Sequence, residues 1–360
     1  MKRLGGLWTQ VVDFNNLLLA FKKAARGKRS RHPVSRFALR LEHDLFRLQE
    51  ELQSGSYTPG KHQQFTIYDR KPRLISAAPF RDRVVHHAVM NIIEPPLDRY
   101  FIYDSYACRK GKGVHAAVDR YQTWAQRYPY VLKMDIASYF PSIDHELLIE
   151  KLERKIKCRR TLGLLRKIIT CSPPSGAPPR WIAGDDLFEP LSRGRGIPIG
   201  NLTSQFFANL YLNDLDHYIK QVLGVKAYLR YVDDTVALGD STSQLREWRE
   251  LIDHRVTAER LRLHARKREI SRTIGGVDVL GYRIFPHRRR IRNDNAFRFH
   301  RRLRAFASGY SRGRLDFENF NPSVQSWIGH AKHGETLSLR RKAFADVVFT
   351  RGSGHTKPSA

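Results

Sequence analysis

Residues 227–239, AYLRYVDDTVALG, are the stretch that decides the fold of this chain. Two short β-forming runs meet there at the adjacent acids Asp233 and Asp234, which is the pattern of a tight hairpin. Adjacent carboxylates at a turn repel each other and are hard to desolvate unless a cation lies between them. The stretch therefore predicts a β-hairpin that presents two acids to a cation.

A third acid, Asp135, stands in a similar setting in YVLKMDIASYF, where residues 130–136 suit a buried strand. Acids on two neighbouring strands form a ready site for Mg²⁺, which prefers oxygen ligands. Two such ions can activate an attacking 3′-hydroxyl and stabilise a leaving pyrophosphate. We therefore expect Asp135, Asp233 and Asp234 to support nucleotidyl transfer. Asp144 precedes the helical run HELLIEKL and is expected to be only its N-cap.

The composition indicates a polyanionic partner. The chain has 360 residues, and its 64 Lys and Arg against 35 Asp and Glu give a net charge of +29 that is spread along the sequence. Binding to nucleic acid explains such an excess, because neutralised phosphates release counterions. The alternatives are charge needed for solubility and attachment to an anionic membrane surface.

Cysteine usage and hydropathy indicate the cellular compartment of the protein. The three cysteines show no CxxC spacing, which favours a reducing cytosol. No apolar run is long enough to span a membrane, and the N-terminus lacks a signal-peptide pattern.

Outward from the acids, strands and helices alternate. The periodicity predicts a hairpin near 65–75, a helix over 81–100 that ends at Pro95 and Pro96, and helices over 145–157, 202–223 and 242–260.

The ordered set of segments resembles a reverse transcriptase over roughly residues 60–335. KMDIASYF, GIPIGNLTSQFFANLYL and YVDD resemble its palm motifs, and RLRLHARKREI and VLGYRI resemble the two motifs that follow. KPRLISAAPFRDRVVHHAV and DSYACRKGKGVHAAV resemble the fingers motifs of group II intron and related prokaryotic enzymes.

The resemblance implies an α+β right-hand polymerase with fingers, a palm built on an antiparallel sheet, and a helical thumb. The implied parts are an N-terminal helical extension (1–60), fingers (61–130), a palm that includes the loop 172–198 (131–285), a basic helical thumb (286–350) and a disordered tail (351–360).

The segment IGNLTSQ narrows the resemblance further. Group II intron enzymes tend to open this motif with Gln-Gly and close it with Ser-Pro, whereas this chain has Ile199-Gly200 and Ser204-Gln205. That variant resembles the reverse transcriptases of diversity-generating retroelements, which implies mutagenesis at adenines. The alternatives are a group II intron or retron-type reverse transcriptase, and a polymerase-fold protein that only binds RNA.

The resemblance assigns roles to individual residues. It implies that Asp135 and Asp233 ligate two Mg²⁺ ions, with Asp234 beside them and the Ile136 carbonyl as a further ligand. Phe140 is implied to be an aromatic gate that excludes a 2′-hydroxyl, although an ordinary core aromatic is the alternative.

Other positions are implied to contact substrates. Arg73 and Lys71 would meet the triphosphate, while Arg81 and Arg83 nearby are alternatives or ion-paired surface residues. Gly200, Ser204 and Gln205 would contact template or incoming base, unless Asn201 or Thr203 merely caps the helix. Lys267 would be a general acid near the pyrophosphate, and Gly281 in VLGYRI would belong to the primer grip.

Ile199 stands where related enzymes carry Gln. Because Ile can neither donate nor accept a side-chain hydrogen bond, we expect looser selection of the nascent base pair at this position.

The implied partners are template RNA, primer or cDNA, dNTPs and a small basic oligomeric accessory protein, with no membrane. The implied setting is the cytoplasm, with the gene carried by a bacterium or a phage.

Overall fold

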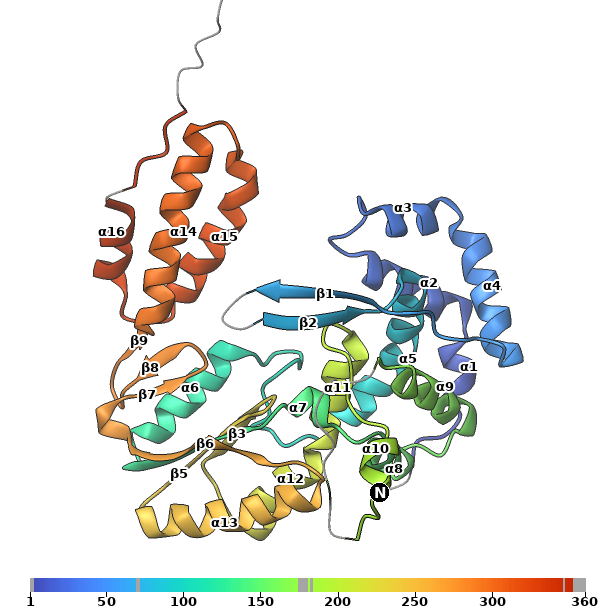
Figure 1. Ribbon diagram of the computed structural model, residues 1–360, viewed down its shortest axis with the longest axis horizontal. Helices are drawn as coiled ribbons and strands as arrows, with labels where there is room; N and C mark the ends of the chain where they lie inside the picture. The colour runs from blue at the N-terminus through green and yellow to red at the C-terminus, as the bar shows by residue number, and fades with distance from the viewer. Residues whose placement is uncertain (1–2, 69–71, 174–180, 182–183, 346, 352–360) are drawn as a thin grey trace, which may run out of the picture. The chain divides into compact units, whose positions relative to one another are not determined.

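The computed structural model describes residues 3–68, 72–173, 181, 184–345 and 347–351 (Figure 1). Lys71, part of the loop 172–198 and the expected tail from 352 onward therefore lie outside the described residues. The chain divides into two compact units. Unit 1 comprises Met1–Gly111, Lys133–Val236 and Arg246–Glu269, and unit 2 comprises Lys112–Leu132, Ala237–Leu245 and Ile270–Ala360. The division into five functional parts stays a prediction.

The N-terminal part of unit 1 is helical. Its helices are α1 (Trp8–Val11), α2 (Phe14–Ala25), α3 (His32–Leu39), α4 (Leu41–Ser54) and α5 (Phe80–Asp98). The Asp13 side chain begins α2 by accepting a hydrogen bond from the Asn16 N–H (3.1 Å). Gly55, at φ 79°, ends α4 as a left-handed C-cap.

The expected end of the long helix at Pro95 and Pro96 is wrong, because α5 continues through both prolines to Asp98. Both prolines lie in the last turns of the helix, so few backbone hydrogen bonds are lost. The fully buried Ile93 and Leu97 gain apolar contacts by staying helical, which offsets that loss.

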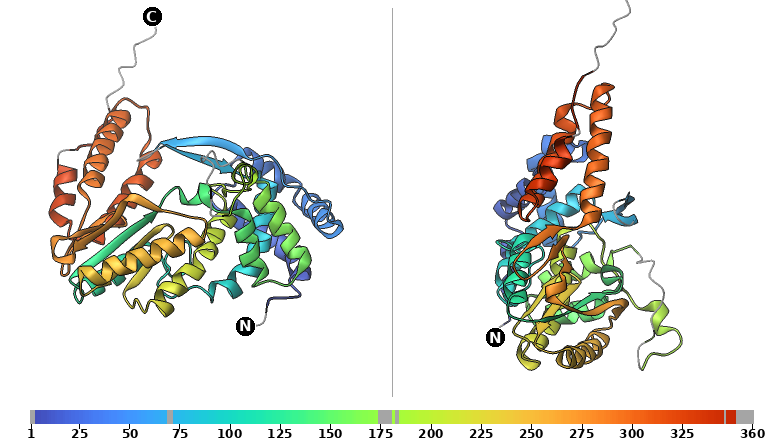
Figure 2. Two further views of the ribbon diagram at one scale, coloured as in Figure 1. Left: turned by 60° about the horizontal axis from the view of Figure 1, so that its bottom comes forward. Right: turned by 90° about the vertical axis from the view of Figure 1, so that its left-hand side faces the viewer.

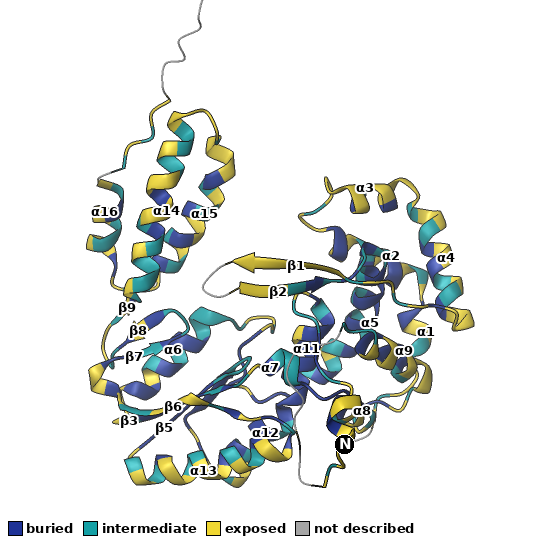
Figure 3. Ribbon diagram, in the orientation of Figure 1, coloured by how far each residue is buried: buried dark blue, intermediate teal, exposed yellow. Residues whose placement is uncertain are grey.

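A two-stranded hairpin lies between α4 and α5, as predicted. Strand β1 (Gln63–Tyr68) pairs antiparallel with β2 (Pro72–Ala77), from Gln63↔Ala77 to Tyr68↔Pro72. All six residues of β1 are exposed, and Figure 3 draws this strand in the colour of exposed residues.

The central sheet carries the acids. It contains β3 (Tyr130–Ile136), β4 (Tyr228–Tyr231), β5 (Asp234–Gly239) and β6 (Leu263–Arg272) in the order β4-β5-β3-β6. The predicted strand 130–136 and the predicted hairpin at 227–239 are both present. Helix α13 (Thr242–Ala258) runs along one side of this sheet (Figure 2).

Helices fill the rest of the central region. They are α7 (Tyr139–Ser142), α8 (His145–Glu153), α9 (Arg159–Thr170), α10 (Glu189–Ser192), α11 (Leu202–Tyr211) and α12 (Asn213–His217), followed by a π-helical turn (Tyr218–Val222). The single helix expected over 202–223 is therefore broken at Leu212. The break changes the direction of the chain, so that the apolar faces of α11 and α12 can each be buried against other parts of the protein.

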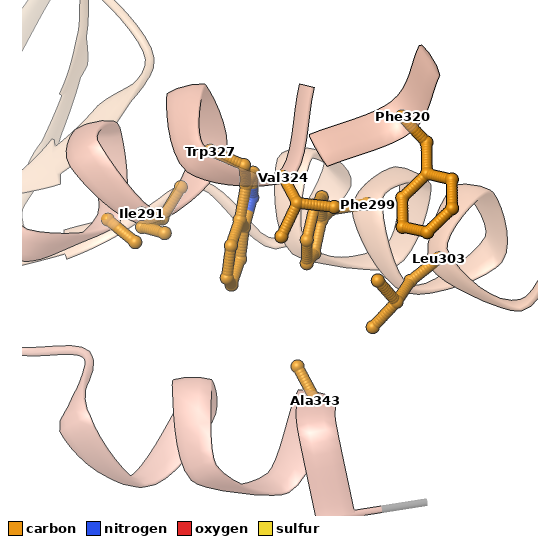
Figure 4. Close-up of a cluster of buried hydrophobic side chains, with 8 residues drawn as sticks. Ile291, Phe299, Leu303, Phe320, Val324, Trp327 and Ala343 are labelled. Carbon is orange, nitrogen blue, oxygen red and sulfur yellow. The ribbon is translucent and has the colours of Figure 1, made fainter. Parts of the chain in front are cut away.

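Unit 2 combines a small sheet with a helical bundle. Helix α6 (Val114–Ala125) contacts β8 of the antiparallel sheet formed by β7 (Val277–Val279), β8 (Tyr282–Ile284) and β9 (Arg289–Ile291). Helices α14 (Asn293–Ser311), α15 (Phe317–Lys332) and α16 (Leu337–Ala345) follow. Their core is an apolar cluster in which the rings of Phe299 and Trp327 stack at 3.7 Å (Figure 4).

Within the described part of the chain, we find no helix that is both long and apolar enough to cross a membrane.

Candidate active site

The three predicted acids lie at neighbouring points of the central sheet, in unit 1. Asp135 is near the end of β3, Asp233 is in the turn after β4, and Asp234 begins β5, the strand beside β3. The Thr235 hydroxyl donates to the Met134 carbonyl (3.4 Å), which ties the two acid-bearing strands together one residue away from the carboxylates. The structure thus brings together residues that are far apart in the sequence.

Burial and repulsion from neighbouring acids make the Asp233 and Asp234 carboxylates costly to ionise. Burial is the main cause that raises the pKa of Asp233 to about 6, and the negative charges of Asp234 and Asp135 add to the shift. Burial likewise raises the pKa of Asp234, with Asp135 adding to it and Lys133 opposing it. The site therefore holds more negative charge than its own cations neutralise.

Lys267, in β6, contacts the Asp135 carboxylate. This hydrogen bond is the main cause that raises the pKa of Lys267, so the side chain carries a proton at neutral pH. The Lys267 side chain is half exposed, whereas that of Asp135 is mostly buried. The predicted lysine is therefore at the acids.

The donor set fits a hard divalent cation in an open site. Among the residues that the structure describes, no group of three or more His, Cys, Asp or Glu side chains is arranged to hold a metal ion. Mg²⁺ does not need one, because it commonly binds one or two carboxylates and keeps waters or substrate phosphates. Asp135 and Asp233 supply such carboxylates, and a cation would relieve the repulsion that raises the pKa of Asp233.

The segment at Ile199 is hydrogen-bonded to the hairpin strand β2. The Ser76 N–H donates to the Ile199 carbonyl (3.1 Å), the Asn201 side-chain amide donates to the Ser76 carbonyl (3.2 Å), and the Ala78 N–H donates to Asn201 Oδ1 (3.2 Å). The Asn201 side chain therefore does not cap α11. One alternative from the sequence was that it would. Sequence reasoning missed this bridge because the bonded residues are 123 positions or more apart.

Gly200 is required here for two reasons. Its φ is +114°, a conformation that residues with a Cβ rarely adopt. A Cβ atom at this position would also lie 2.8 Å from Ile75 Cγ2 of β2. The close approach that the sequence predicts at Gly200 is made to the protein's own hairpin.

The first turn of α11 separates two residues that the sequence grouped together. Gln205 is exposed, so it remains a candidate contact for template or base. Ser204 is only 2% exposed, so the protein covers its side chain in this structure, and its contact with template or base stays a prediction. Helix α11 packs against α5 and α8, which covers the face that carries Ser204.

Phe140 follows the site acid Asp135 and is half-buried. Its carbonyl accepts a hydrogen bond from the Ile197 N–H (3.0 Å), which ties the gate position to the segment before Ile199. The neighbouring Tyr139 is buried, and its hydroxyl donates to the Ala208 carbonyl, as expected of a core aromatic.

The basic residues of the hairpin region have different surroundings. Arg73 is exposed on β2, opposite Ile67. Arg81 pairs with Glu51, and Arg83 Nε donates to the Ala78 carbonyl (2.8 Å). Arg81 thus joins α5 to α4, and Arg83 bonds the residue that follows β2, which leaves Arg73 as the described candidate for a triphosphate contact.

Two further assignments concern turns. Asp144 accepts from the Leu147 N–H (3.0 Å), which confirms it as the N-cap of α8. Gly281 lies in unit 2, in the turn between β7 and β8, at φ +95°. A Cβ at Gly281 would lie 3.5 Å from the His330 ring, so this turn packs against α15.

Comparison with known proteins identifies the family. The family model for reverse transcriptase (RNA-dependent DNA polymerase) matches residues 61–284, which is more than half of the chain. Protein YkfC of Escherichia coli is 29% identical over 219 residues, covering 58% of this chain and 55% of that protein.

Two other relatives are intron proteins by name. The group II intron-encoded protein LtrA of Lactococcus lactis is 25% identical over 184 residues, covering 50% of this chain and 29% of LtrA. Nuclear intron maturase 1 of Arabidopsis thaliana is 27% identical over 93 residues, covering 26% of this chain and 13% of the maturase. The chain spans about half the length of YkfC and smaller shares of the other two.

The family match and the mixture of helices with antiparallel sheet confirm the predicted α+β right-hand polymerase fold. Proteins with this domain generally use divalent metal ions, which agrees with the donor set at Asp135 and Asp233. The chain belongs to the reverse transcriptase family.

Proposed function

We propose that this protein synthesises DNA from dNTPs on an RNA template by nucleotidyl transfer with two Mg²⁺ ions. The observation that carries the proposal is the meeting of Asp135, Asp233, Asp234 and Lys267 at adjoining strands of the palm sheet. The family match over residues 61–284 supports the same reaction.

Each residue has a task in this proposal. Asp135 and Asp233, with the Ile136 carbonyl, hold the metal ions, and Asp234 adds negative charge that favours their binding. When bound, Mg²⁺ lowers the pKa of the primer 3′-hydroxyl and stabilises charge on the pyrophosphate. Lys267 is protonated beside the acids and donates a proton to the leaving pyrophosphate.

The flanking residues select the substrate. Arg73, with Lys71, contacts the triphosphate, and Phe140 lies under the sugar. Gly200 and Gln205 border the nascent base pair, and Gly281 contributes to the primer grip.

Primer extension tests the proposal. With an RNA template, a DNA primer, dNTPs and Mg²⁺, the wild type extends the primer, and Asp233→Asn reduces extension by about a thousandfold or more, as loss of a metal ligand in two-metal catalysis should. RNA binding stays near the wild-type level, because it depends on the distributed positive charge. RNA binding by a wild type that never extends a primer would instead favour the RNA-binding alternative.

For the finer function, we propose an error-prone reverse transcriptase of a diversity-generating retroelement, assisted by a small basic oligomeric accessory protein. The departure from Gln-Gly at Ile199-Gly200 supports this proposal. A group II intron enzyme is the second candidate, because LtrA and the nuclear maturase are intron proteins by name.

Sequencing of cDNA separates these two candidates. The retroelement hypothesis predicts misincorporation concentrated opposite template adenines, and Ile199→Gln should lower it. A discrimination loss of about 1.4 kcal/mol corresponds to a tenfold rise in errors. Uniformly faithful wild-type cDNA, with and without a candidate accessory protein, would exclude the mutagenic hypothesis.

A further inference from the structure

Arg230, in β4, is completely buried three residues before Asp233. A guanidinium group has five N–H donors, and in Arg230 each has an acceptor. The acceptors are the Asp216 carboxylate (Nε to Oδ1, 2.8 Å; Nη2 to Oδ2, 2.6 Å), Asn209 Oδ1 (Nη1, 3.1 Å), the Asn209 carbonyl (Nη2, 3.2 Å) and the Val232 carbonyl (Nη1, 3.0 Å).

The ion pair with Asp216 accounts for the burial of the Arg230 charge. Asp216 is also fully buried, and it accepts a further hydrogen bond from the Tyr228 hydroxyl (2.8 Å). Helix α12 and strand β4 are thereby joined through two neutralised charges. The pair alone does not require the fifth bond, which runs to the turn that carries Asp233.

That fifth bond holds an unfavourable backbone conformation. Val232 has φ +58°, a left-handed value that a β-branched residue rarely adopts. Its carbonyl belongs to the peptide unit that also contains the Asp233 nitrogen. A donor that fixes this peptide plane therefore fixes the position of the Asp233 Cα and restricts the directions in which its side chain can leave the backbone.

We propose that Arg230 is a positioning residue that orients the Val232–Asp233 peptide and so places the Asp233 carboxylate for metal binding. This inference rests on the proposed function, because it assumes that Asp233 is a metal ligand. Arg230 does not touch metal or substrate; it acts through the turn. Asp216 and Asn209 hold the guanidinium in place from α12 and α11.

The test uses Arg230→Lys, which keeps a positive charge opposite Asp216. Lysine has three donors on one atom and cannot span the carboxylate, the amide and the Val232 carbonyl as the planar fork does. Binding of Mn²⁺ is measured by electron paramagnetic resonance without nucleotides, and half-saturation by Mg²⁺ is measured in primer extension. The dissociation constant for Mn²⁺ and the Mg²⁺ concentration at half-saturation should each rise about tenfold or more, as for other residues that orient a metal ligand.

The matched control removes another buried ion pair of unit 1. Lys151 bonds Glu259 at 2.8 Å, and both side chains are mostly buried; they also pair with Asp214 and Arg255, which lie outside the turn. Lys151→Met/Glu259→Met should lower the melting temperature yet leave Mn²⁺ binding unchanged. If Arg230 served only stability, Arg230→Lys would also lower the melting temperature and leave Mn²⁺ binding unchanged. That result would overturn the inference.

A second variant covers the case in which Arg230→Lys does not fold. Arg230→Met/Asp216→Leu removes both charges and leaves neither one unpaired in the core. It should fold and still bind Mn²⁺ about tenfold or more weakly, and wild-type binding would overturn the inference. If the wild type itself failed to bind Mn²⁺, both the metal assignment of Asp233 and the inference about Arg230 would be wrong. Wild-type binding by the variants would overturn only the inference about Arg230, so the two outcomes can be told apart.

Discussion

At the scale of single residues, the proposed metal ligand Asp233 should link pH to metal binding. Its pKa is raised to about 6, mainly by burial, so the metal-free folded protein binds a proton more tightly than the unfolded chain does. The contribution of this group to stability is therefore greatest at low pH and falls as the pH rises from about 4 through 6.

Mg²⁺ should reverse this trend, because it binds the ionised form of Asp233. At a Mg²⁺ concentration ten times its dissociation constant, ligand binding adds about 1.4 kcal/mol to the free energy of unfolding. We expect this Mg²⁺-dependent stabilisation to appear above pH 6 and to vanish below pH 5 in thermal unfolding scans. Asp233→Asn should show no such pH dependence, and an equal Mg²⁺ effect at pH 5 and pH 7 would contradict the assignment.

Phe140 is the residue on which sugar selection should depend. Phe140→Ala opens space beside the sugar, so incorporation of ribonucleotides relative to dNTPs should rise about tenfold or more, equivalent to about 1.4 kcal/mol of discrimination. Single-nucleotide incorporation assays measure this ratio. Tyr139→Phe, which alters only the buried neighbour, is the control. Unchanged selectivity in a folded Phe140→Ala variant would show that Phe140 is an ordinary core aromatic.

At the scale of elements, Asn201 joins the hairpin β1–β2 to the start of α11. Asn201→Ala leaves the Ser76 carbonyl and the Ala78 N–H without these partners, which should cost about 1–3 kcal/mol in the free energy of unfolding. Because the hairpin carries Arg73, the KM for dNTPs should rise as well. Chemical denaturation and steady-state kinetics measure the two effects.

Asn16 offers the matched control for that prediction. Its side-chain amide also bridges backbone carbonyls, those of Val11 and Ala88 (3.0 Å each), but within the N-terminal helices. Asn16→Ala should lose similar stability with an unchanged KM for dNTPs. If both variants changed KM equally, the bridge at Asn201 would have no special part in substrate binding.

At the scale of the whole molecule, the net charge of +29 should dominate RNA affinity. With six neutralised phosphates, a rise in salt from 50 to 200 mM should lower the affinity for single-stranded RNA about 300-fold, less than for a duplex, because single strands release fewer counterions. Fluorescence anisotropy with a labelled RNA measures this slope. Affinity that does not depend on salt would show that the charge serves another purpose, such as solubility.

The sequence alone determined the elements that bear the acids, because their signals are local. A mostly apolar run predicted β3, and the acidic pair predicted the turn after β4. The order of the motifs was enough to place Asp135, Asp233 and Lys267 together, because proteins that share a family also share its fold.

Only the tertiary structure decided which polar residues are exposed and which face the core. Ser204 and Gln205 are adjacent in the sequence, yet packing of α11 against α5 and α8 buries the first and exposes the second. Asn201 resembles a helix cap in the sequence, and nothing local to Arg230 indicates its role, until their partners on other elements are known. Hydrogen bonds between segments far apart in the chain leave no local pattern, because they depend on where folding brings the partner.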